Sequence, residues 1–287
     1  MLFIMTMGAC SALSEQSGRI MAFVEREVRR LMGRAIYHYD LIEEGDSIAV
    51  GVSGGKDSML LLWFLRERMA RTPITYNLVA VHVDPGFDSE SSKRLEEFFI
   101  GEQFKYEIIR TDHGIRAHSP ENRENPCFLC ARLRRKALFQ KAKELGCKKI
   151  ALGHNQDDFI ETFFINICYA GQVAAILPKQ PFFGGEVTVI RPLAMTPAGK
   201  VERAVKKLGL PLLANCCPSL EKNKRSQVRS LLETLYSKNE KVRGNVFHAM
   251  SHVNRDYLPP PLKSPRAGNS PESWAFARKR GPKNNEL

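Results

Sequence analysis

The chain has 287 residues, 43% of them hydrophobic, which suits one large α/β domain with appendages or two small domains. Its net charge of +12 favours a polyanionic partner such as nucleic acid, because Lys and Arg are frequent well inside the chain as well as near its C-terminal end. No run of about 18 apolar residues occurs, so we expect neither a transmembrane helix nor a membrane partner. The seven cysteines are odd in number and few for a disulfide framework, which predicts a cytoplasmic protein whose thiols are reduced or bound to metal.

The N-terminal part, residues 1–44, is predicted to be a short segment followed by a helix. Its apolar start is too short for a signal peptide and has no basic region, so we expect a later methionine, Met5, Met7 or Met21, to be the true start. Residues 18–36 carry apolar side chains at helical spacing, which predicts a helix packed in front of the main domain.

The main domain, residues 45–218, opens with the stretch around which the chain is organised. Residues 47–52 are apolar and β-branched, which predicts a buried strand. Gly54 and Gly55 permit a tight turn directly after it, and residues 59–65 then continue as an apolar helix. Free backbone N–H groups and the helix dipole converge at such a turn, so the stretch predicts an anion-binding site.

The remainder of this domain alternates between strand and helix patterns. Strands are predicted at 77–83, 106–110, 149–153 and 187–190, and helices at 89–99, 132–145 and 159–169. This alternation predicts an α/β fold with a doubly wound parallel sheet. Ligands of such sheets lie beyond the carboxyl ends of the strands, here after Val52, Val83 and Gly153.

The C-terminal part differs from the main domain in composition. Residues 219–257 are polar and basic with one apolar side, which predicts a small helical region. Residues 258–287 are rich in Pro, Gly, Ser, Asn, Lys and Arg and contain few hydrophobic residues, so we predict a disordered basic tail.

The turn after the first strand is not the common phosphate-binding P-loop. That motif has a Gly separated by four residues from the Gly-Lys pair that follows it, and a Ser or Thr directly after the Lys. In this chain the first of these positions is Val50 and the last is Asp57. The run Ser-Gly-Gly-Lys-Asp-Ser resembles the signature of the ATP pyrophosphatase, or PP-loop, superfamily. Members of this superfamily cleave ATP between the α and β phosphates and adenylate an oxygen of their substrate. The resemblance implies a pyrophosphate site made by Ser53, Gly54, Gly55 and Ser58. Lys56 would add charge to this site, and Asp57 would orient the loop or a magnesium ion.

A second polar motif stands at the carboxyl end of the fourth predicted strand. Gly153-His154 is followed by Asp157-Asp158. Adjacent carboxylates suit a magnesium nucleotide, because Mg²⁺ prefers oxygen ligands. The alternative is that Asp157 or Asp158 only caps the following helix. Because the motif shares a sheet edge with the glycine loop, we favour nucleotide binding.

Cys127 and Cys130 form a C-x-x-C motif, which can be half a zinc site, a redox pair or part of an iron–sulfur site. The chain has no second C-x-x-C and no C-x-x-H to complete a zinc site, and the motif does not follow the first strand as a thioredoxin motif would. The remaining candidates are Cys216 and Cys217, and we expect only one of them to join the site because adjacent side chains point apart. Three thiolates fit a [4Fe-4S] cluster whose fourth iron is open to a sulfur donor.

The order of these motifs is similar to that in the tRNA 2-thiocytidine synthetase family. The shared series is the glycine loop, the C-x-x-C followed by Ala-Arg-Leu-Arg-Arg, Leu-Gly-His with two aspartates, Ile-Arg-Pro-Leu at 190–193 and a late cysteine. In this family the third cluster ligand precedes a small residue and Ser, which Cys217 matches better than Cys216. Two departures leave the subgroup and the exact substrate open: Asn155 stands where the family often has a second His, and Cys216 is an additional thiol.

The resemblance implies an ATP-dependent tRNA-cytidine 2-sulfurtransferase with ATP, Mg²⁺ and a [4Fe-4S] cluster. ATP would adenylate the 2-oxygen of the anticodon-loop cytidine 32, and sulfur carried on the cluster would replace it. Cys127, Cys130 and Cys217 would hold the cluster, and Asp57, Cys127 and Cys130 would be catalytic. The expected partners are tRNA and a sulfur donor such as a cysteine desulfurase, and a homodimer is also considered. Basic side chains after the C-x-x-C, Arg132, Arg134, Arg135 and Lys136, would meet RNA phosphates or lie on a solvated helix face.

Three other interpretations stay open. The first is a PP-loop enzyme without a cluster, such as a tRNA-lysidine synthetase or a small-molecule amide ligase. The second is a non-enzymatic RNA-binding protein with a structural zinc. The third is a sulfur-transfer enzyme that acts on a different RNA or on a metabolite.

Overall fold

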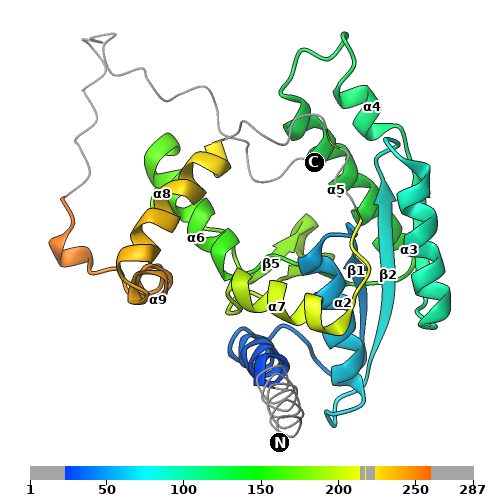
Figure 1. The fold of residues 1–287 in the computed structure, drawn as a ribbon, viewed down its shortest axis with the longest axis horizontal. Coiled ribbons are helices and arrows are strands. Elements are labelled where there is room, and N and C mark those ends of the chain that lie inside the picture. The colour runs from blue at the N-terminus through cyan, green and yellow to red at the C-terminus, as the bar shows by residue number, and fades with distance from the viewer. Residues whose placement is uncertain (1–22, 214–216, 218–223, 260–287) are drawn as a thin grey trace, which may run out of the picture. The chain divides into compact units, whose positions relative to one another are not determined.

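A computed structural model describes residues 23–213, 217 and 224–259 of the chain (Figure 1). These residues belong to two compact units. One unit comprises the chain up to Asp158 and resumes at Leu177–Lys222, and the other comprises Phe159–Ile176 and the chain from Asn223. The predicted domain boundaries at 44, 218 and 257 stay a prediction, and the second unit differs from the predicted C-terminal region by including residues 159–176. The predicted tail from residue 260, the first 22 residues and Cys216 lie outside the described residues.

The first unit is built on a six-stranded sheet, which confirms the predicted α/β class. In chain order its strands are β1 (Asp46–Gly51), β2 (Tyr76–Asp84), β3 (Tyr106–Arg110), β4 (Lys149–Ala151), β5 (Lys179–Phe182) and β6 (Val187–Ile190). Across the sheet the order is β3-β2-β1-β4-β6-β5, and every pair is parallel except β5 with β6. The sheet is therefore parallel with one antiparallel edge strand.

That edge strand is absent from the sequence prediction for a local reason. It has only four residues and includes Pro181, which lacks an N–H for a hydrogen bond. Proline is tolerated in a sheet mainly at an edge, where one side of the strand needs no partner. The position of β5 at the end of the strand order satisfies this condition.

The helices of the first unit follow the predicted alternation. Residues 23–38 are helical, and the later helices are α2 (Lys56–Met69), α3 (Ser89–Gly101), α4 (His113–Ala117), α5 (Pro126–Glu144) and α7 (Ala198–Leu208).

The helix predicted at 132–145 begins six residues too late, because α5 already starts at Pro126. The side chain of Asn125 caps α5 by accepting a hydrogen bond from the Phe128 N–H, and Pro126 takes the first helical position. Both are helix-start signals. Their consequence is that the C-x-x-C motif lies in the first turns of a helix rather than in a loop.

Two hydrophobic cores cover the two faces of this sheet. Alternate residues of a strand point to opposite faces, so Ile48 and Val50 belong to the larger core and Ala49 belongs to the smaller one. The larger core also contains side chains of residues 23–38, α2, α3 and α7, and the smaller core contains those of α5. This arrangement of helices on both faces is the predicted doubly wound architecture.

The chain direction across the sheet reverses between β1 and β4. From β1 the chain adds β2 and then β3 on one side, and it returns to place β4 on the other side of β1. Open α/β sheets bind ligands at such a switch point, beyond the carboxyl ends of the strands. The turn after β1 and the motif after β4 therefore meet at the position where this fold class has its ligand site.

The second unit is a helical body with its own small core. It contains α6 (Gln156–Ile165) from Phe159 onward, the π-helical turn Asn166–Ala170, α8 (Lys224–Lys238), α9 (Lys241–Ala249) and the 3₁₀ turn Arg255–Tyr257. Ile160, Val228 and Leu232 form its buried centre. Beside them the buried carboxylate of Glu161 accepts two hydrogen bonds from Arg229, at 2.7 and 3.2 Å. In the part of the chain that the structure describes, no helix is long and apolar enough to cross a membrane.

Candidate nucleotide and thiol site

The turn between β1 and α2 is held by hydrogen bonds among its own residues. The Ser58 hydroxyl donates to the Gly55 carbonyl oxygen at 2.9 Å, and its oxygen accepts from the Ser53 N–H at 3.1 Å. The Ser53 hydroxyl oxygen lies 3.2 Å from that of Ser58 and accepts from the Gly55 N–H at 3.3 Å. Ser53 and Gly55 are exposed, whereas Ser58 is buried. The turn therefore exposes Ser53 and Gly55 to solvent, while the buried Ser58 fixes them at the N-terminus of α2.

Gly54 is required at its position in this turn. Its φ of +79° lies in the left-handed region, and a Cβ there would come within 2.4 Å of the Leu213 side chain. The Leu213 N–H donates to the Gly54 carbonyl oxygen at 3.0 Å. A distant segment of the chain thus covers the turn and fixes its backbone.

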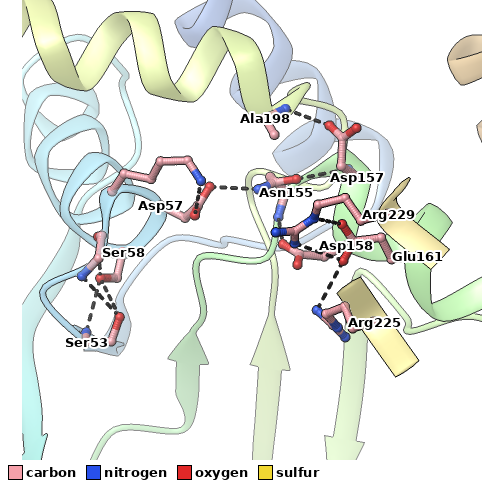
Figure 2. A network of polar contacts seen from close by, with 12 residues as sticks. Ser53, Asp57, Ser58, Asn155, Asp157, Asp158, Glu161, Ala198, Arg225 and Arg229 are labelled. Atoms are coloured by element: carbon pink, nitrogen blue, oxygen red, sulfur yellow. Dashed lines mark hydrogen bonds and ion pairs between the residues drawn. The ribbon is translucent and has the colours of Figure 1, made fainter. Parts of the chain in front are cut away.

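The motif after β4 contacts this turn directly. A Cβ on Gly153 would lie 2.8 Å from backbone atoms of Asp57 and Ser58, so only glycine permits this approach. The next contact is a hydrogen bond of 2.7 Å from the Asn155 side-chain amide to Asp57 Oδ1. Figure 2 shows Asn155 between Asp57 and Asp157, and its side chain is 96% buried. Lys56 Nζ lies 3.4 Å from the other carboxylate oxygen of Asp57.

Asp157 and Asp158 both take part in helix capping. The Asn155 side-chain oxygen accepts from the Asp157 N–H, and Asp158 Oδ2 accepts from the Asn155 N–H, each at 2.9 Å. These reciprocal bonds form a capping box at the start of α6. Asp157 Oδ2 also accepts from the Ala198 N–H at 2.7 Å, at the start of α7 (Figure 2). The structure thus shows the capping that the sequence left as an alternative, and magnesium binding by these two carboxylates stays a prediction.

His154 is oriented by Arg191, which follows β6. The Arg191 Nε–H donates to His154 Nδ1 at 3.3 Å, so in the neutral ring the proton lies on Nε2. Arg191 also donates to the Leu177 carbonyl oxygen and to Gln180. Burial, reinforced by the positive charge of Arg135, lowers the pKa of Arg191 to about 10. The arginine stays charged at neutral pH and adds positive charge beside the motif after β4.

The two cysteines of the C-x-x-C motif have different environments on α5. Cys127 is exposed and Cys130 is buried. Burial raises the pKa of the Cys130 thiol, and the neighbouring thiols of Cys217 and Cys127 raise it further. Arg134, one helical turn later, opposes this rise through its charge and a hydrogen bond to the thiol. The three predicted cluster ligands therefore interact electrostatically, with a guanidinium beside the buried thiol.

The PP-loop domain family matches residues 23–235. The chain belongs to this family. Among curated proteins, tRNA-cytidine(32) 2-sulfurtransferases match it closely. The protein of that name from Citrifermentans bemidjiense is 36% identical over 234 residues, which are 80% of this chain and 92% of the relative. The one from Syntrophotalea carbinolica is 39% identical over 236 residues, which are 81% of this chain and 91% of the relative. Within the PP-loop family the chain belongs with these 2-sulfurtransferases.

A solved structure supports the same fold. The U34-tRNA thiolase NcsA from Methanococcus maripaludis, determined with its [4Fe-4S] cluster, is similar with a TM-score of 0.67. The similarity covers 81% of this chain and 79% of the thiolase, at 24% sequence identity. At this level of identity the likeness establishes the PP-loop fold and nothing more specific.

The PP-loop chain has a donor set that fits an iron–sulfur cluster. The described residues contain no group of three His, Cys, Asp or Glu side chains placed to hold a single metal ion. A [4Fe-4S] cluster makes a different demand, because each cysteine binds a separate iron. Cys127, Cys130 and Cys217 are three soft ligands, and Cys217 and Cys127 each raise the pKa of Cys130. This donor chemistry fits the cluster, and the ligand assignment stays a prediction.

Three residues of the site could not be assigned from motif matching. Asn155 departs from the family pattern, yet its amide joins the turn after β1 to the motif after β4. Leu213 and Arg191 reach the site from later segments of the chain. For Arg191 the signal was its place in the Ile-Arg-Pro-Leu run after a strand. For Leu213 the sequence contains no such signal.

Proposed function

We propose that this PP-loop protein is an ATP-dependent tRNA-cytidine 2-sulfurtransferase that thiolates cytidine 32 of the anticodon loop. The observation that carries the proposal is the similarity to curated enzymes of that name, which extends over 92% of the relative's length. The match to the PP-loop domain family, at residues 23–235, includes the whole turn between β1 and α2, called the nucleotide turn below. A shared fold alone would not support a shared substrate. Here the identity of 34–39% to several such relatives adds the support that the fold lacks.

The nucleotide turn would carry out the activation step. The 2-oxygen of the cytidine is a poor leaving group. In the proposed reaction it attacks the α-phosphorus of ATP, and pyrophosphate departs with the electrons of the broken P–O bond. The exposed groups of Ser53 and Gly55, together with the positive end of α2, are suited to hold the pyrophosphate. The activated oxygen later leaves the base as part of AMP.

Magnesium would bind at the carboxylates beside this turn. Asp57 is the best placed, because Asn155 and Lys56 fix both of its oxygens at the edge of the turn. Mg²⁺ typically uses one or two protein carboxylates and completes its shell with phosphate oxygens and water. Asp157 and Asp158 would be the further carboxylates of this site, after the second motif of the sequence.

Cys127, Cys130 and Cys217 would hold the [4Fe-4S] cluster, which supplies the sulfur that replaces the activated oxygen. Cys130 lies at the buried side of this site and Cys127 at its exposed side. Arg134 provides positive charge next to the Cys130 thiol. This charge stabilises anionic sulfur ligands relative to neutral thiols. An external sulfur donor, such as a cysteine desulfurase, would reload the site.

Basic side chains of both units would bind the tRNA. On α5, Arg135 and Lys136 are exposed, and Arg132 is partly exposed beside the Phe128 ring, 5.7 Å from its centroid. On α8, Arg225 and Arg229 are half exposed in the second unit. Lys and Arg contacts to phosphates give affinity that falls steeply with salt. We further propose that the enzyme acts in the cytoplasm, and a homodimer is the assembly to be tested.

An in vitro assay tests this function. The full chain, purified anaerobically and reconstituted with iron and sulfide, is incubated with unmodified tRNA, MgATP and a sulfide source. We expect 2-thiocytidine in the digested tRNA and an equal amount of AMP. Cys127→Ala should abolish 2-thiocytidine. AMP formation without a thiolated base, unchanged by Cys127→Ala, would contradict the proposal and favour a cluster-free ligase. Zinc in place of iron and sulfide in the anaerobic protein would favour a structural metal site.

A further inference from the structure

Three polar side chains are buried together next to the nucleotide turn, and none belongs to the recognised motifs. His82 and Asp84 are on β2, and Ser92 is on α3; their exposed fractions are 3%, 5% and 2%. His82 Nε2 lies 3.2 Å from the Ser92 hydroxyl oxygen, which donates to Asp84 Oδ2 at 2.6 Å. Buried polar groups are costly unless they form hydrogen bonds, and these contacts meet that requirement.

The other ring nitrogen of His82 contacts the nucleotide turn. His82 Nδ1 lies 2.7 Å from the carbonyl oxygen of Val52. A carbonyl oxygen can only accept, so Nδ1 carries the proton. Burial lowers the pKa of His82, which favours the neutral ring. In the neutral ring with its proton on Nδ1, Nε2 carries no proton. The Ser92 hydroxyl then has one proton and two possible acceptors, His82 Nε2 and Asp84 Oδ2. It donates to Asp84, because that contact is the shorter one. The bond to Val52 is therefore the main hydrogen bond of this histidine.

The accepting carbonyl belongs to the peptide group that opens the nucleotide turn. Val52 C=O and Ser53 N–H are the two ends of one planar peptide. The C=O end is held by His82, and the N–H end donates to Ser58 Oγ at 3.1 Å. The paired register of β1 with β2 ends at Gly51, and the Val52 N–H still donates to the Val81 carbonyl oxygen of β2 at 2.9 Å. The side chain of His82 thus adds a hydrogen bond from β2 to this segment just after the paired register ends.

Asp84, at the other end of the buried group from His82, fixes a second turn at the same sheet edge. Asp84 Oδ1 accepts from the Gly86 N–H at 2.8 Å, in the turn that follows β2. Gly86 has φ of +88°, and a Cβ there would lie 2.4 Å from the Thr111 carbonyl oxygen. The turn after β2 therefore has its own anchor in Asp84, and the Ser92 contact joins it to the histidine.

We propose that His82 is a positioning residue for ATP: its Nδ1–H fixes the plane of the Val52–Ser53 peptide and thereby the direction in which Ser53 meets the phosphates. This proposal rests on the proposed use of the turn as the ATP site. Because His82 is buried beneath the turn, it acts through the backbone and does not touch the nucleotide. The role requires a hydrogen-bond donor at the Nδ1 position and does not require an imidazole.

Two substitutions separate the two ring nitrogens. In His82→Asn the amide nitrogen can take the place of Nδ1 and keep the bond to Val52. In His82→Gln the longer side chain puts its amide near the place of Nε2 and leaves the Val52 carbonyl without its donor. Ser92→Ala is the control for the rest of the group, because it removes the contact of Nε2 and the hydrogen bond to Asp84 and leaves the Nδ1 bond to Val52 in place.

The experiment measures ATP binding by calorimetry and the KM and kcat of AMP formation with the reconstituted full chain. Loss of the hydrogen-bond donor to the buried Val52 carbonyl oxygen corresponds to a ~5- to 150-fold change in the equilibrium that depends on it, which here is ATP binding. We expect His82→Gln to raise the Kd and KM for ATP within this range, whereas His82→Asn and Ser92→Ala stay within about threefold of the parent. Equal KM values for the Asn and Gln variants would overturn the proposal.

Two further measurements keep this test independent of the proposed function. Absence of ATP binding by the parent protein would refute the nucleotide site itself, whereas normal binding by the parent and by His82→Gln would refute only the role of His82. Long-range ¹H–¹⁵N spectra of histidine-labelled protein, with the His82 signal identified by its loss in His82→Asn, should show the Nδ1–H tautomer. An Nε2–H tautomer at neutral pH would also overturn the proposal.

Discussion

Replacement of Asn155 by Asp tests the link between the two halves of the nucleotide site. Asn155 has two separate tasks. Its side-chain oxygen caps α6 by accepting from the Asp157 N–H, and its amide donates to Asp57 at 2.7 Å. In Asn155→Asp an oxygen still caps the helix, but the donor to Asp57 becomes a second acceptor. The substitution therefore changes the contact with Asp57 while the fold around it is preserved.

The size of the effect follows from the burial of this contact. Asn155 is 4% exposed, so water cannot replace the lost donor. A hydrogen bond to a charged group contributes about 1.5–3 kcal/mol, which corresponds to roughly 10- to 150-fold in an equilibrium constant. Two carboxylates at this distance also repel each other, and a shared proton relieves the repulsion. We expect the KM for MgATP to rise 10- to 150-fold at pH 8 on this reasoning, and to recover partly as the pH is lowered and the introduced carboxyl group is protonated.

The assay follows AMP formation against MgATP concentration from pH 6 to pH 8, with thermal melting as a check on the fold. Asn155→Ser is the matched control, because its hydroxyl can cap α6 but carries no second acid. It should show the loss without recovery at low pH. A parent-like KM for Asn155→Asp at pH 8, with an unchanged melting temperature, would refute the assigned role of this bond.

Three other substitutions test separate parts of the structure. Gly54→Ala should lower the free energy of unfolding by about 1–3 kcal/mol, because it combines a positive φ with a clash against Leu213; an unchanged urea midpoint would contradict this. Glu161→Gln should weaken the second unit by on the order of 1 kcal/mol, because Arg229 is more than half exposed and solvent screens the lost charge; hydrogen exchange of α8 amides should become faster, and equal protection would show that the pair is dispensable. Burial lowers the pKa of His82 below the unfolded value of 6.5, while the bond to Val52 and the charge of Asp84 raise it and the charge of Arg134 lowers it. As pH falls below 6.5 the unfolded chain therefore binds a proton that folded His82 does not, and the free energy of unfolding falls. His82→Asn should therefore lose less stability than the parent between pH 7 and pH 5, as measured by urea midpoints, and parallel pH profiles would contradict this assignment.

The sequence was most informative where local chemistry decides the structure. The apolar strand before the glycine turn and the alternation of strands and helices were sufficient for the sheet class and for the edge where the motifs meet. The start of α5 was also predictable, since Asn125 and Pro126 are a cap and a first-turn proline. It was missed because the basic run after the C-x-x-C dominated the helix pattern. The edge strand β5 was not predictable from local pattern, because its pairing with β6 depends on the tertiary fold.

The contacts that tune the site depend on side chains that meet only after folding. Asn155 and Asp57 are 98 positions apart, and His82 and Val52 are 30 apart. No local pattern identifies either pair. Leu213 is a further example, since a leucine in an irregular segment carries no signal that it will cover Gly54. The motifs thus located the site, while the residues that hold it in shape required the structure.

The most direct test of the account is nucleoside mass spectrometry of tRNA from cells that lack this gene and carry plasmid copies of it. We expect 2-thiocytidine to disappear in the deletion strain and to return with the parent gene. It should not return with Cys130→Ser, a variant that keeps the nucleotide turn intact. Unchanged 2-thiocytidine in the deletion strain, or full recovery with Cys130→Ser, would contradict the central claim that one protein couples ATP activation to sulfur transfer at these cysteines.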